Sequence, residues 1–325
     1  MSAGSPPLKK AIRRATGAAS VGEGEHIQQL WDGYGEVLRF ELHGASVPSV
    51  VVKHVCPPVA KKLGGSVNAA HARKLKSYQV EAHFYGVHAS RAAKRCRMPQ
   101  VYQCQKTQTG FLFILEDLDA AGYAGRRTSL TEAELLGCLR WLAEFHAAFL
   151  DVKPEGVWKV GTYWSLNTRA AELARMTDAQ LREAAPKLEA RLNQCRYKTW
   201  VHGDAKPANF CFSSDPDRVA ALDFQYTGGG CGVKDVAYLL DCCLGGATPE
   251  HSAEAYLDAY FAALRDGLSA RQVPLDVAAV EAEWRTLYPV AWADFARFLD
   301  GWAPGMYTPS ALSRRLIQTA LNQPT

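Results

Sequence analysis

The sequence predicts an α+β fold with a β-rich N-terminal lobe, residues 1–117, and a mainly helical C-terminal lobe, residues 118–325. In the first range, short runs of β-branched and aromatic residues are separated by turns, which is typical of antiparallel strands. In the second, apolar residues recur every three or four positions, as on one face of an α-helix. The chain has 325 residues, 48% of them hydrophobic, and can therefore bury a sizeable core in two lobes.

Two predicted hairpins account for the β-rich character of the N-terminal lobe. Residues 37–42 and 48–53 are rich in β-branched and apolar residues, and a turn at 43–45 separates them. Residues 100–105 and 111–115 form the second pair, joined by a short polar segment that ends in Gly.

Long apolar periodicities predict the helices of the C-terminal lobe. Thr131 and Glu134 form a capping-box pattern that opens an amphipathic run as far as Phe149. His146 lies on the apolar face of this run, where we expect a packed core histidine rather than a ligand. Farther on, five large side chains recur at helical spacing: Trp284, Tyr288, Trp292, Phe295 and Leu299. They predict a core stripe, and the alternative is a wall that binds an apolar or cationic substrate.

The most informative motif is His202-Gly203-Asp204, with Asn209 five residues after the Asp and Asp223 fourteen residues after the Asn. Phosphoryl transfer from ATP needs a carboxylate that orients the acceptor hydroxyl and two oxygen ligands that hold Mg²⁺ on the phosphates. Asp204, Asn209 and Asp223 supply these three groups. The alternative is that each merely caps a turn or ends a strand, but turn propensity does not explain the three together.

The residues between Asn209 and Asp223 predict how these two side chains meet. Residues 209–212 and 219–222 predict short strands, and residues 213–218 predict a polar turn. A hairpin of this length returns Asp223 to the end at which Asn209 lies, so both side chains can reach one cation.

These motifs resemble those of the protein-kinase-like small-molecule phosphotransferases, which include aminoglycoside phosphotransferases, choline kinases and ecdysteroid-kinase-like proteins. The resemblance covers most of residues 28–300. It implies a bilobal protein-kinase-like fold with ATP and Mg²⁺ as cofactors. By this resemblance, Asp204 matches the catalytic Asp, and Asn209 and Asp223 match the two Mg²⁺ ligands. Asp235 matches a buried Asp that braces the catalytic loop.

The resemblance also implies nucleotide-binding residues in the N-terminal lobe. Lys53 ends a predicted strand and matches the lysine that reaches the α and β phosphates, while Glu81 matches the glutamate that keeps this lysine pointed inward. Glu81 belongs to a predicted helix from Tyr78 to Ala89, and the alternative for it is an ordinary solvated residue. Residues 57–77 form a basic connection too long for a simple turn, which predicts a flap near the phosphates or a solvated run of charge.

Four further nucleotide-binding positions follow from their place in the chain. Gly33 and Gly35 precede a predicted strand, where they would let backbone N–H groups approach ATP, and a plain turn is the alternative. Glu116 and Leu118 follow the second hairpin, in the segment that resembles the hinge between the lobes. Backbone groups of such a hinge bind the adenine edge, so side-chain identity matters little there.

Lys206 completes the motif Asp-x-Lys-Pro-x-Asn that is usual in Ser/Thr protein kinases. It would neutralise charge on the transferring phosphoryl group, and a solvated loop lysine is the alternative.

The segment after Asp223 differs from that of protein kinases and favours a small acceptor. Only eleven residues separate Asp223 from Asp235, and no Ala-Pro-Glu motif follows, which leaves no room for a peptide-binding activation loop. We therefore expect phosphorylation of a small hydroxylated substrate, with a pseudokinase or nucleotide-binding scaffold and a protein kinase as alternatives.

Composition narrows the class of protein further. A formal charge of +4 and a pI near 8.5 are too mild to predict nucleic-acid binding, and no apolar run is long enough to span a membrane. Nine scattered cysteines predict reduced thiols in a cytoplasmic protein. Residues 5–14 are basic and lack the apolar core of a secretory signal, so we expect an accessory helix or a tail within residues 1–25, and an organelle transit peptide is the alternative. The acceptor's identity and the oligomeric state stay open.

Overall fold

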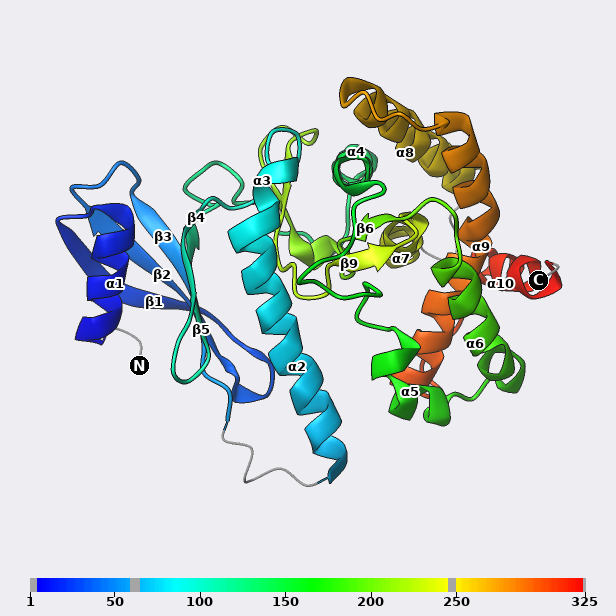
Figure 1. Cartoon of the computed structure of the whole chain (residues 1–325), viewed down its shortest axis with the longest axis horizontal. Helices are drawn as coiled ribbons and strands as arrows, with labels where there is room; N and C mark the ends of the chain where they lie inside the picture. The colour runs from blue at the N-terminus through cyan, green and yellow to red at the C-terminus, as the bar shows by residue number, and fades with distance from the viewer. Residues whose placement is uncertain (1–4, 59–64, 245–249, 324–325) are drawn as a thin grey trace.

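A five-stranded antiparallel sheet forms the N-terminal part of the molecule (Figure 1). The computed structural model describes residues 5–58, 65–244 and 250–323. Neighbouring strands pair in the order β1-β2-β3-β5-β4. Their bounds are β1 Ser20–Gln29, β2 Gly35–His43, β3 Ser49–Val55, β4 Val101–Lys106 and β5 Phe111–Glu116.

Four of these strands are the predicted ones, and the fifth, β1, is an edge strand that the sequence did not indicate. Most side chains of β1 are exposed and polar, and Gly22 and Gly24 interrupt it, so it lacks the apolar alternation of a half-buried strand. Pairing with β2 stabilises it instead. Gly24 also makes room for Phe40, because a Cβ there would lie 2.9 Å from the Phe40 ring.

Helix α1, Pro6–Thr16, packs on one face of the sheet (Figure 1). Its Leu8 and Ile12 are fully buried and share a small core with side chains of β2, β3 and β5. Gly17, with a φ of +72°, ends the helix in the left-handed conformation that glycine adopts readily. The described part of residues 1–25 therefore holds a docked helix and the beginning of β1.

Helix α2, Gly65–His83, lies between the sheet and the helical part of the molecule (Figure 1). The predicted start at Tyr78 is wrong, because residues 65–77 are helical as well. This basic stretch is rich in Ala, Lys, Arg and Leu, which are strong helix formers, although its charges favoured a loop. The remainder of the expected flap, residues 59–64, lies outside the described residues. Two short segments follow α2: a π turn at Phe84–His88 and α3 at Ala89–Ala92.

The C-terminal part is mainly helical, as predicted. The capping box at Thr131 and Glu134 is present and begins the first long helix. In the described ranges, no helix has the length and hydropathy needed to cross a membrane. The helices are α4 Glu132–Phe149, α5 Ala170–Arg175, α6 Ala179–Asn193, α7 Val233–Cys243, α8 Glu250–Ala270, α9 Val277–Trp302 and α10 Ala311–Asn322.

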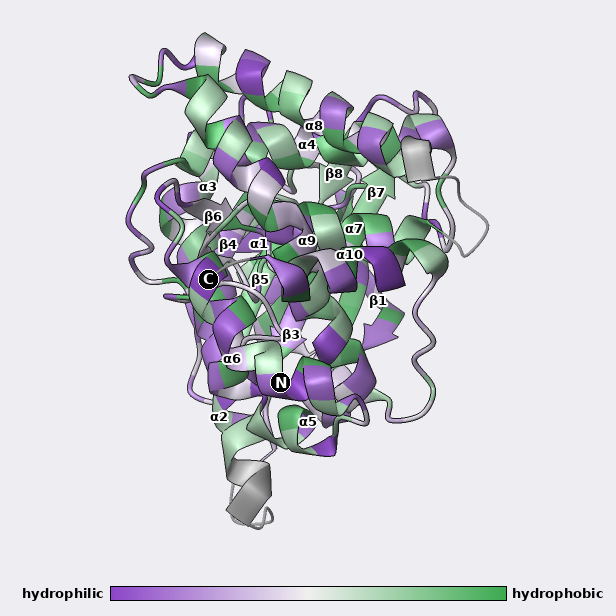
Figure 2. Ribbon diagram, turned by 90° about the vertical axis from the view of Figure 1, so that its right-hand side faces the viewer, coloured by the Kyte–Doolittle hydropathy of each residue, from purple (hydrophilic) through white to green (hydrophobic). Residues whose placement is uncertain are grey.

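The predicted aromatic stripe belongs to the core. Helix α9 continues through Pro289, and four of the five predicted side chains are at most 5% exposed: Trp284, Tyr288, Trp292 and Phe295. Figure 2 shows how outer helices such as α6 and α10 alternate hydrophilic and hydrophobic residues, as expected of helices with one face on this core. The alternative of a substrate-binding wall is therefore not supported for these four side chains.

Two small antiparallel sheets carry the predicted catalytic segments. Strand β6, Thr199–Val201, pairs with β9, Gly228–Gly230. Strand β7, Phe210–Phe212, pairs with β8, Val219–Ala221, and forms the hairpin that the sequence predicts. The segments that enter and leave these strands contain the His-Gly-Asp motif, Asn209 and Asp223.

We expect Gly35 to be required at the start of β2, directly after the turn that follows β1. Its φ is +133°, and a Cβ there would lie 2.0 Å from the carbonyl oxygen of His54. Alanine therefore combines backbone strain of about 1–3 kcal/mol with overpacking of about 1–3 kcal/mol. Gly35→Ala should lower the free energy of unfolding by about 2–6 kcal/mol in urea denaturation followed by circular dichroism.

Gly33→Ala is the matched control, two residues earlier in the turn before β2. Its φ is +71°, but nothing lies within 4 Å of the position that a Cβ would occupy there. It should cost only the strain of a left-handed residue, about 1–2 kcal/mol. Equal losses for the two variants would show that the contact with His54 is not the reason for glycine at position 35.

Candidate active site

Asp235 of α7 binds the backbone at the start of the predicted catalytic loop, residues 202–209. Asp235 is fully buried, its Oδ2 accepts the His202 N–H at 2.5 Å, and its Oδ1 accepts the Gly203 N–H at 2.9 Å. Nε2 of His146 lies 3.1 Å from the same Oδ2. These partners satisfy a carboxylate that would be costly to bury alone. Asp235 therefore braces the loop, and His146 is the core histidine that the sequence predicts.

Three side chains hold the carboxylate of Asp204. The Tyr238 hydroxyl donates to Oδ1 at 3.1 Å, Asn209 Nδ2 donates to Oδ2 at 2.9 Å, and Lys206 Nζ lies 3.3 Å from Oδ2. Burial alone would lower the pKa of Lys206, but the charges of Asp204 and Asp223 raise it above its usual value. The two predicted catalytic side chains, Asp204 and Lys206, are thus in contact, and Lys206 also remains partly exposed to solvent.

Tyr238 is a site residue that sequence analysis missed. It follows Asp235 by three residues on α7, so one face of the helix presents both. This spacing was the available signal. The rings of Phe295 and Trp164 pack at 4.4 Å and 5.2 Å from the Tyr238 ring, between centroids, and keep its hydroxyl directed at Asp204.

Asn209 and Asp223 come together at the open end of the β7–β8 hairpin. The Leu222 N–H donates to the Asn209 carbonyl oxygen at 3.0 Å, which places Asp223 beside Asn209. Asp223 has a left-handed backbone with a φ of +68°. Non-glycine residues rarely adopt this conformation, and it is often kept where a side chain has to be aimed.

The oxygen atoms of this pair fit Mg²⁺. Asn209 uses its amide nitrogen on Asp204, so its carbonyl oxygen points away from that contact. Both hydrogen bonds to the Asp223 carboxylate go to Oδ1, which leaves Oδ2 for a ligand. Within residues 5–58, 65–244 and 250–323, no three His, Cys, Asp or Glu side chains form a metal cage. Mg²⁺ suits such a site, because it takes few protein oxygens and completes its shell with phosphates and water.

The predicted contact between Lys53 and Glu81 is confirmed. Lys53 Nζ lies 2.9 Å and 2.7 Å from the two carboxylate oxygens of Glu81, and 3.3 Å from Oδ1 of Asp223. Lys53 is 9% exposed and Glu81 is 1% exposed, which excludes a solvated helix residue at position 81. Strand β3, helix α2 and the segment after β8 therefore meet at one ammonium group.

Burial and charge act in opposite directions on the pKa values of this cluster. Burial alone would lower the pKa of Lys53, but the charges of Asp223 and Glu81 raise it above its usual value. Burial raises the pKa of Glu81 to about 7 against the opposing charge of Lys53. Burial would also raise the pKa of Asp223, but Lys53 and other nearby lysines hold it below its usual range. Lys53 and Asp223 are therefore charged at neutral pH.

Gln225 is a second residue that sequence analysis did not assign to the site. Its Nε2 donates to Asp223 Oδ1 at 2.5 Å, and its Oε1 accepts from Ser77 Oγ at 3.0 Å and from Lys74 Nζ at 3.3 Å. Gln225 therefore ties α2 to Asp223. Its place two residues after Asp223 was visible in the sequence, but its partners on α2 were not.

Gly33 lies in the turn between β1 and β2, which includes the short helix η1, Trp31–Gly33, and Gly35 is the first residue of β2. The Gly33 N–H donates to the Leu30 carbonyl oxygen at 3.2 Å, so it closes the turn itself. Gly35 allows β2 to approach His54 of β3. Both glycines have a structural reason, and their contact with ATP stays a prediction.

Glu116 and Leu118 lie where β5 leaves the sheet. The Glu116 carboxylate pairs with Arg97 at 2.6 Å and 2.8 Å, and its N–H donates to the Gln100 carbonyl oxygen at 2.8 Å. The Leu118 carbonyl oxygen accepts the Tyr123 N–H at 2.8 Å, whereas the Leu118 N–H has no acceptor among the described residues. Of these groups, the Leu118 N–H is the donor available to an adenine edge.

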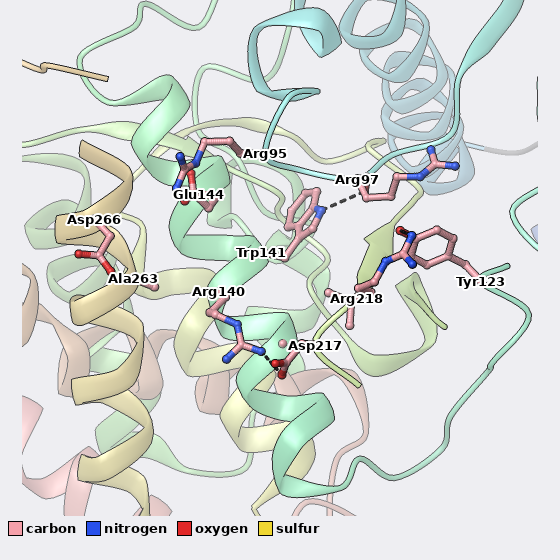
Figure 3. Close-up of a pocket in the computed structure, with 12 residues that line it drawn as sticks. Arg95, Arg97, Tyr123, Arg140, Trp141, Glu144, Asp217, Arg218, Ala263 and Asp266 are labelled. Carbon is pink, nitrogen blue, oxygen red and sulfur yellow. Dashed lines mark hydrogen bonds and ion pairs between the residues drawn. The ribbon is translucent and has the colours of Figure 1, made fainter. Parts of the chain in front are cut away.

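None of the predicted site residues lines a cavity of about 470 Å³ (Figure 3). It is a charged depression between α4, α8 and the turn of the β7–β8 hairpin. Three of its four arginines form ion pairs: Arg140 with Asp217, Arg95 with Glu144 and Arg97 with Glu116. Because these charges already compensate one another, the cavity does not indicate a particular ligand.

A smaller cavity of about 130 Å³ borders the catalytic loop and is lined in part by Thr162, Ser165 and Tyr226. The Thr162 N–H donates to the Tyr226 carbonyl oxygen at 3.1 Å, and the next residue donates to the Gly203 carbonyl oxygen at 3.1 Å. Thr162 and Ser165 are each 3% exposed, and their hydroxyl oxygens have no hydrogen-bond partner among the described residues. Buried hydroxyls without a partner are unfavourable, so they can bind a polar group that enters the cavity.

The fold and the site define a class of protein, the protein-kinase-like small-molecule phosphotransferases. A family model described as the phosphotransferase enzyme family matches residues 26–272, about three quarters of the chain. The chain belongs to this family. The predicted enzyme class, a phosphotransferase with an alcohol group as acceptor, is thereby confirmed.

The solved structures that share the α+β fold include the two described here. A protein of Ralstonia eutropha, assigned as an aminoglycoside phosphotransferase, is 15% identical with a TM-score of 0.51, over 97% of this chain and 94% of that one. Plasmodium vivax ethanolamine kinase is 12% identical with a TM-score of 0.50, over 93% of this chain and 81% of that one. At these identities the likeness concerns the fold alone. No curated protein matches the chain in sequence.

We expect Tyr238→Phe to lower the kcat for phosphoryl transfer about tenfold, because the variant loses one charge-assisted hydrogen bond to Asp204. The aromatic ring and its packing are kept. Steady-state kinetics measure the effect. Tyr288→Phe is the matched control, since Tyr288 is also buried and its hydroxyl has no hydrogen-bond partner among the described residues. Equal kcat losses in both variants would contradict a specific role of Tyr238 in orienting Asp204.

Proposed function

We propose that the protein is an ATP- and Mg²⁺-dependent kinase that transfers the γ-phosphate to a hydroxyl of a small molecule. The observation that carries this proposal is the meeting of Lys53 with Glu81 at 2.7 Å and with Asp223 at 3.3 Å. Asp223 lies beside Asn209, whose amide holds Asp204. A phosphate-binding cation, two metal ligands and a carboxylate for the acceptor are thus grouped as phosphoryl transfer requires.

In this proposal ATP lies between a nucleotide-binding lobe, residues 1–117, and a catalytic and acceptor-binding lobe, residues 118–325. Lys53 binds the α and β phosphates, and Glu81 keeps the ammonium group in place. The Leu118 N–H meets the adenine edge, with Glu116 as its neighbour in the hinge. Gly33 and Gly35 bring the β1–β2 turn close to the phosphates.

Asn209 and Asp223 hold Mg²⁺, which neutralises charge on the β and γ phosphate oxygens when it is bound. Asp204 aligns the acceptor hydroxyl for in-line attack and takes its proton late. Tyr238 and Asn209 fix the carboxylate for this task, and a carboxylate has lone pairs left for one more donor. Lys206 lies close enough to Asp204 to neutralise charge on the transferring phosphoryl group.

The acceptor places part of its structure in the cavity of about 130 Å³ beside the catalytic loop. The buried hydroxyls of Thr162 and Ser165 suit a hydroxylated molecule. The rings of Trp158 and Tyr226, stacked at 6.1 Å between centroids, provide an apolar wall. All nine cysteines are free thiols, which agrees with a cytoplasmic protein, and the mild net charge gives no reason to expect a nucleic-acid partner.

The two alternatives are a protein kinase, which requires a different segment after Asp223, and a pseudokinase or scaffold, which would show no turnover. A protein kinase needs a peptide-binding activation segment, but residues 224–234 are taken up by a turn, by β9 and by the beginning of α7. A pseudokinase or nucleotide-binding scaffold would keep the fold without turnover. A pseudokinase is less favoured, because the chain has all four residues that turnover requires: Lys53, Asp204, Asn209 and Asp223.

The proposal is tested by Mg²⁺-dependent ATP turnover against a pooled library of small alcohols, amino alcohols, sugars, sterols and aminoglycosides. We expect wild-type protein to form a phosphorylated product, and Asp204→Asn to lower kcat about a hundred- to ten-thousandfold, because it removes the proton acceptor. Nucleotide affinity of this variant should stay nearly unchanged.

Asp266→Asn is the control, because Asp266 is an exposed acid on α8 away from Asp204. It should retain wild-type turnover. Equal turnover of Asp204→Asn and wild type would reject the assignment of Asp204. ATP binding without transfer to any small acceptor would favour the pseudokinase, whereas transfer to proteins alone would favour the protein kinase.

A further inference from the structure

Lys74 of α2 is a cation beside the site that the proposed mechanism does not use. Its Nζ lies 3.3 Å from Gln225 Oε1 and 5.1 Å from the centre of the Tyr78 ring. Lys53 Nζ lies 5.6 Å from the centre of the same ring. One tyrosine is therefore flanked by two ammonium groups from different elements of the fold.

The two lysines differ in their counter-ions. Lys53 forms ion pairs with Glu81 and Asp223, whereas Lys74 forms no ion pair with any described residue. A partly buried ammonium group without a counter-ion is unfavourable, and the free energy improves when an anion binds to it.

The surroundings agree with a cation that lacks its partner. Burial lowers the pKa of Lys74, and the positive charge of Lys53 lowers it further, while Asp223, Glu81 and Asp204 act in the opposite direction without compensating. Lys74 therefore interacts electrostatically with Asp223, the proposed metal ligand, and with Asp204, the predicted catalytic carboxylate. Its hydrogen bond to Gln225 holds the ammonium group beside Asp223.

The spacing along α2 separates the tasks of the two lysines. Lys74 and Glu81 are seven residues apart, about two turns or 10 Å along the helix, and therefore lie on the same face. Glu81 holds Lys53 at one end of this face, where the proposed mechanism places the α and β phosphates. Lys74 lies at the other end, and an anion that reaches it extends beyond the β phosphate.

We infer that Lys74 binds the γ-phosphoryl group of ATP and thereby makes the site discriminate ATP from ADP. This inference rests on the proposed function, because it requires ATP as the donor. It adds a second phosphate-binding lysine, carried by α2 and held by Gln225. The residue touches the transferring group and would stabilise the charge that spreads over its oxygens during transfer.

The test compares the dissociation constants of ADP and of AMP-PNP, an ATP analogue with a γ-phosphoryl group, in the presence of Mg²⁺ by isothermal titration calorimetry. Lys74→Met should weaken AMP-PNP about ten- to a hundredfold, as expected for the loss of one charge-assisted contact, and should change ADP less than about threefold. Lys74→Arg keeps the charge and should preserve most of the preference for AMP-PNP.

Lys76→Met is the matched control, because Lys76 is an exposed lysine on the same helix. It should leave both affinities unchanged. Equal weakening of AMP-PNP and ADP by Lys74→Met, or no change in either, would overturn the inference, and thermal melting of each variant shows that the comparison is made between folded proteins. If wild-type protein binds neither nucleotide, the proposed function fails; if it prefers AMP-PNP and Lys74→Met keeps that preference, only the role of Lys74 fails.

Discussion

The buried cluster of Lys53, Glu81 and Asp223 is the interaction on which the arrangement of the site depends. An ammonium group and two carboxylates with little exposure to water are stable together only when their geometry is close and their remaining hydrogen bonds are satisfied. Their contacts of 2.7–3.3 Å meet this condition. Because the three residues come from β3, α2 and the segment after β8, the cluster relates the sheet, the long helix and the metal-binding hairpin.

Aromatic packing next to Asp223 supports the cluster of Lys53, Glu81 and Asp223. The π turn that ends α2 presents Phe84, whose ring stacks on Phe224 at 4.3 Å between centroids. Phe224 also lies 4.8 Å from the ring of His202 at the start of the catalytic loop. A shift of α2 would therefore disturb both Asp223 and this loop. Single turns of π-helix often occur at functional sites, and this one contains the Phe84 that stacks on Phe224.

The C-terminal part contributes rigidity and orientation. Asp235 uses both carboxylate oxygens on backbone N–H groups, and Tyr238 on the same helix holds Asp204. Helix α9 packs behind α7 through Phe295 and other buried aromatic side chains. A fully satisfied buried carboxylate and a tightly packed aromatic core both reduce the freedom of the loop, which favours a site prepared before substrates bind.

The sequence by itself determined the features that depend on local spacing: the α+β division, four strands of the sheet, the β7–β8 hairpin, the capping box of α4, and the grouping of Asp204, Asn209 and Asp223. Strand and helix periodicities and fixed motif distances express these features directly. Tertiary structure decided the rest. β1 is stable because it pairs with β2, and the partners of Tyr238, Gln225 and Lys74 come from distant parts of the chain or from packing that orients them. No local pattern records such contacts, because they arise only when separate elements meet in the folded molecule.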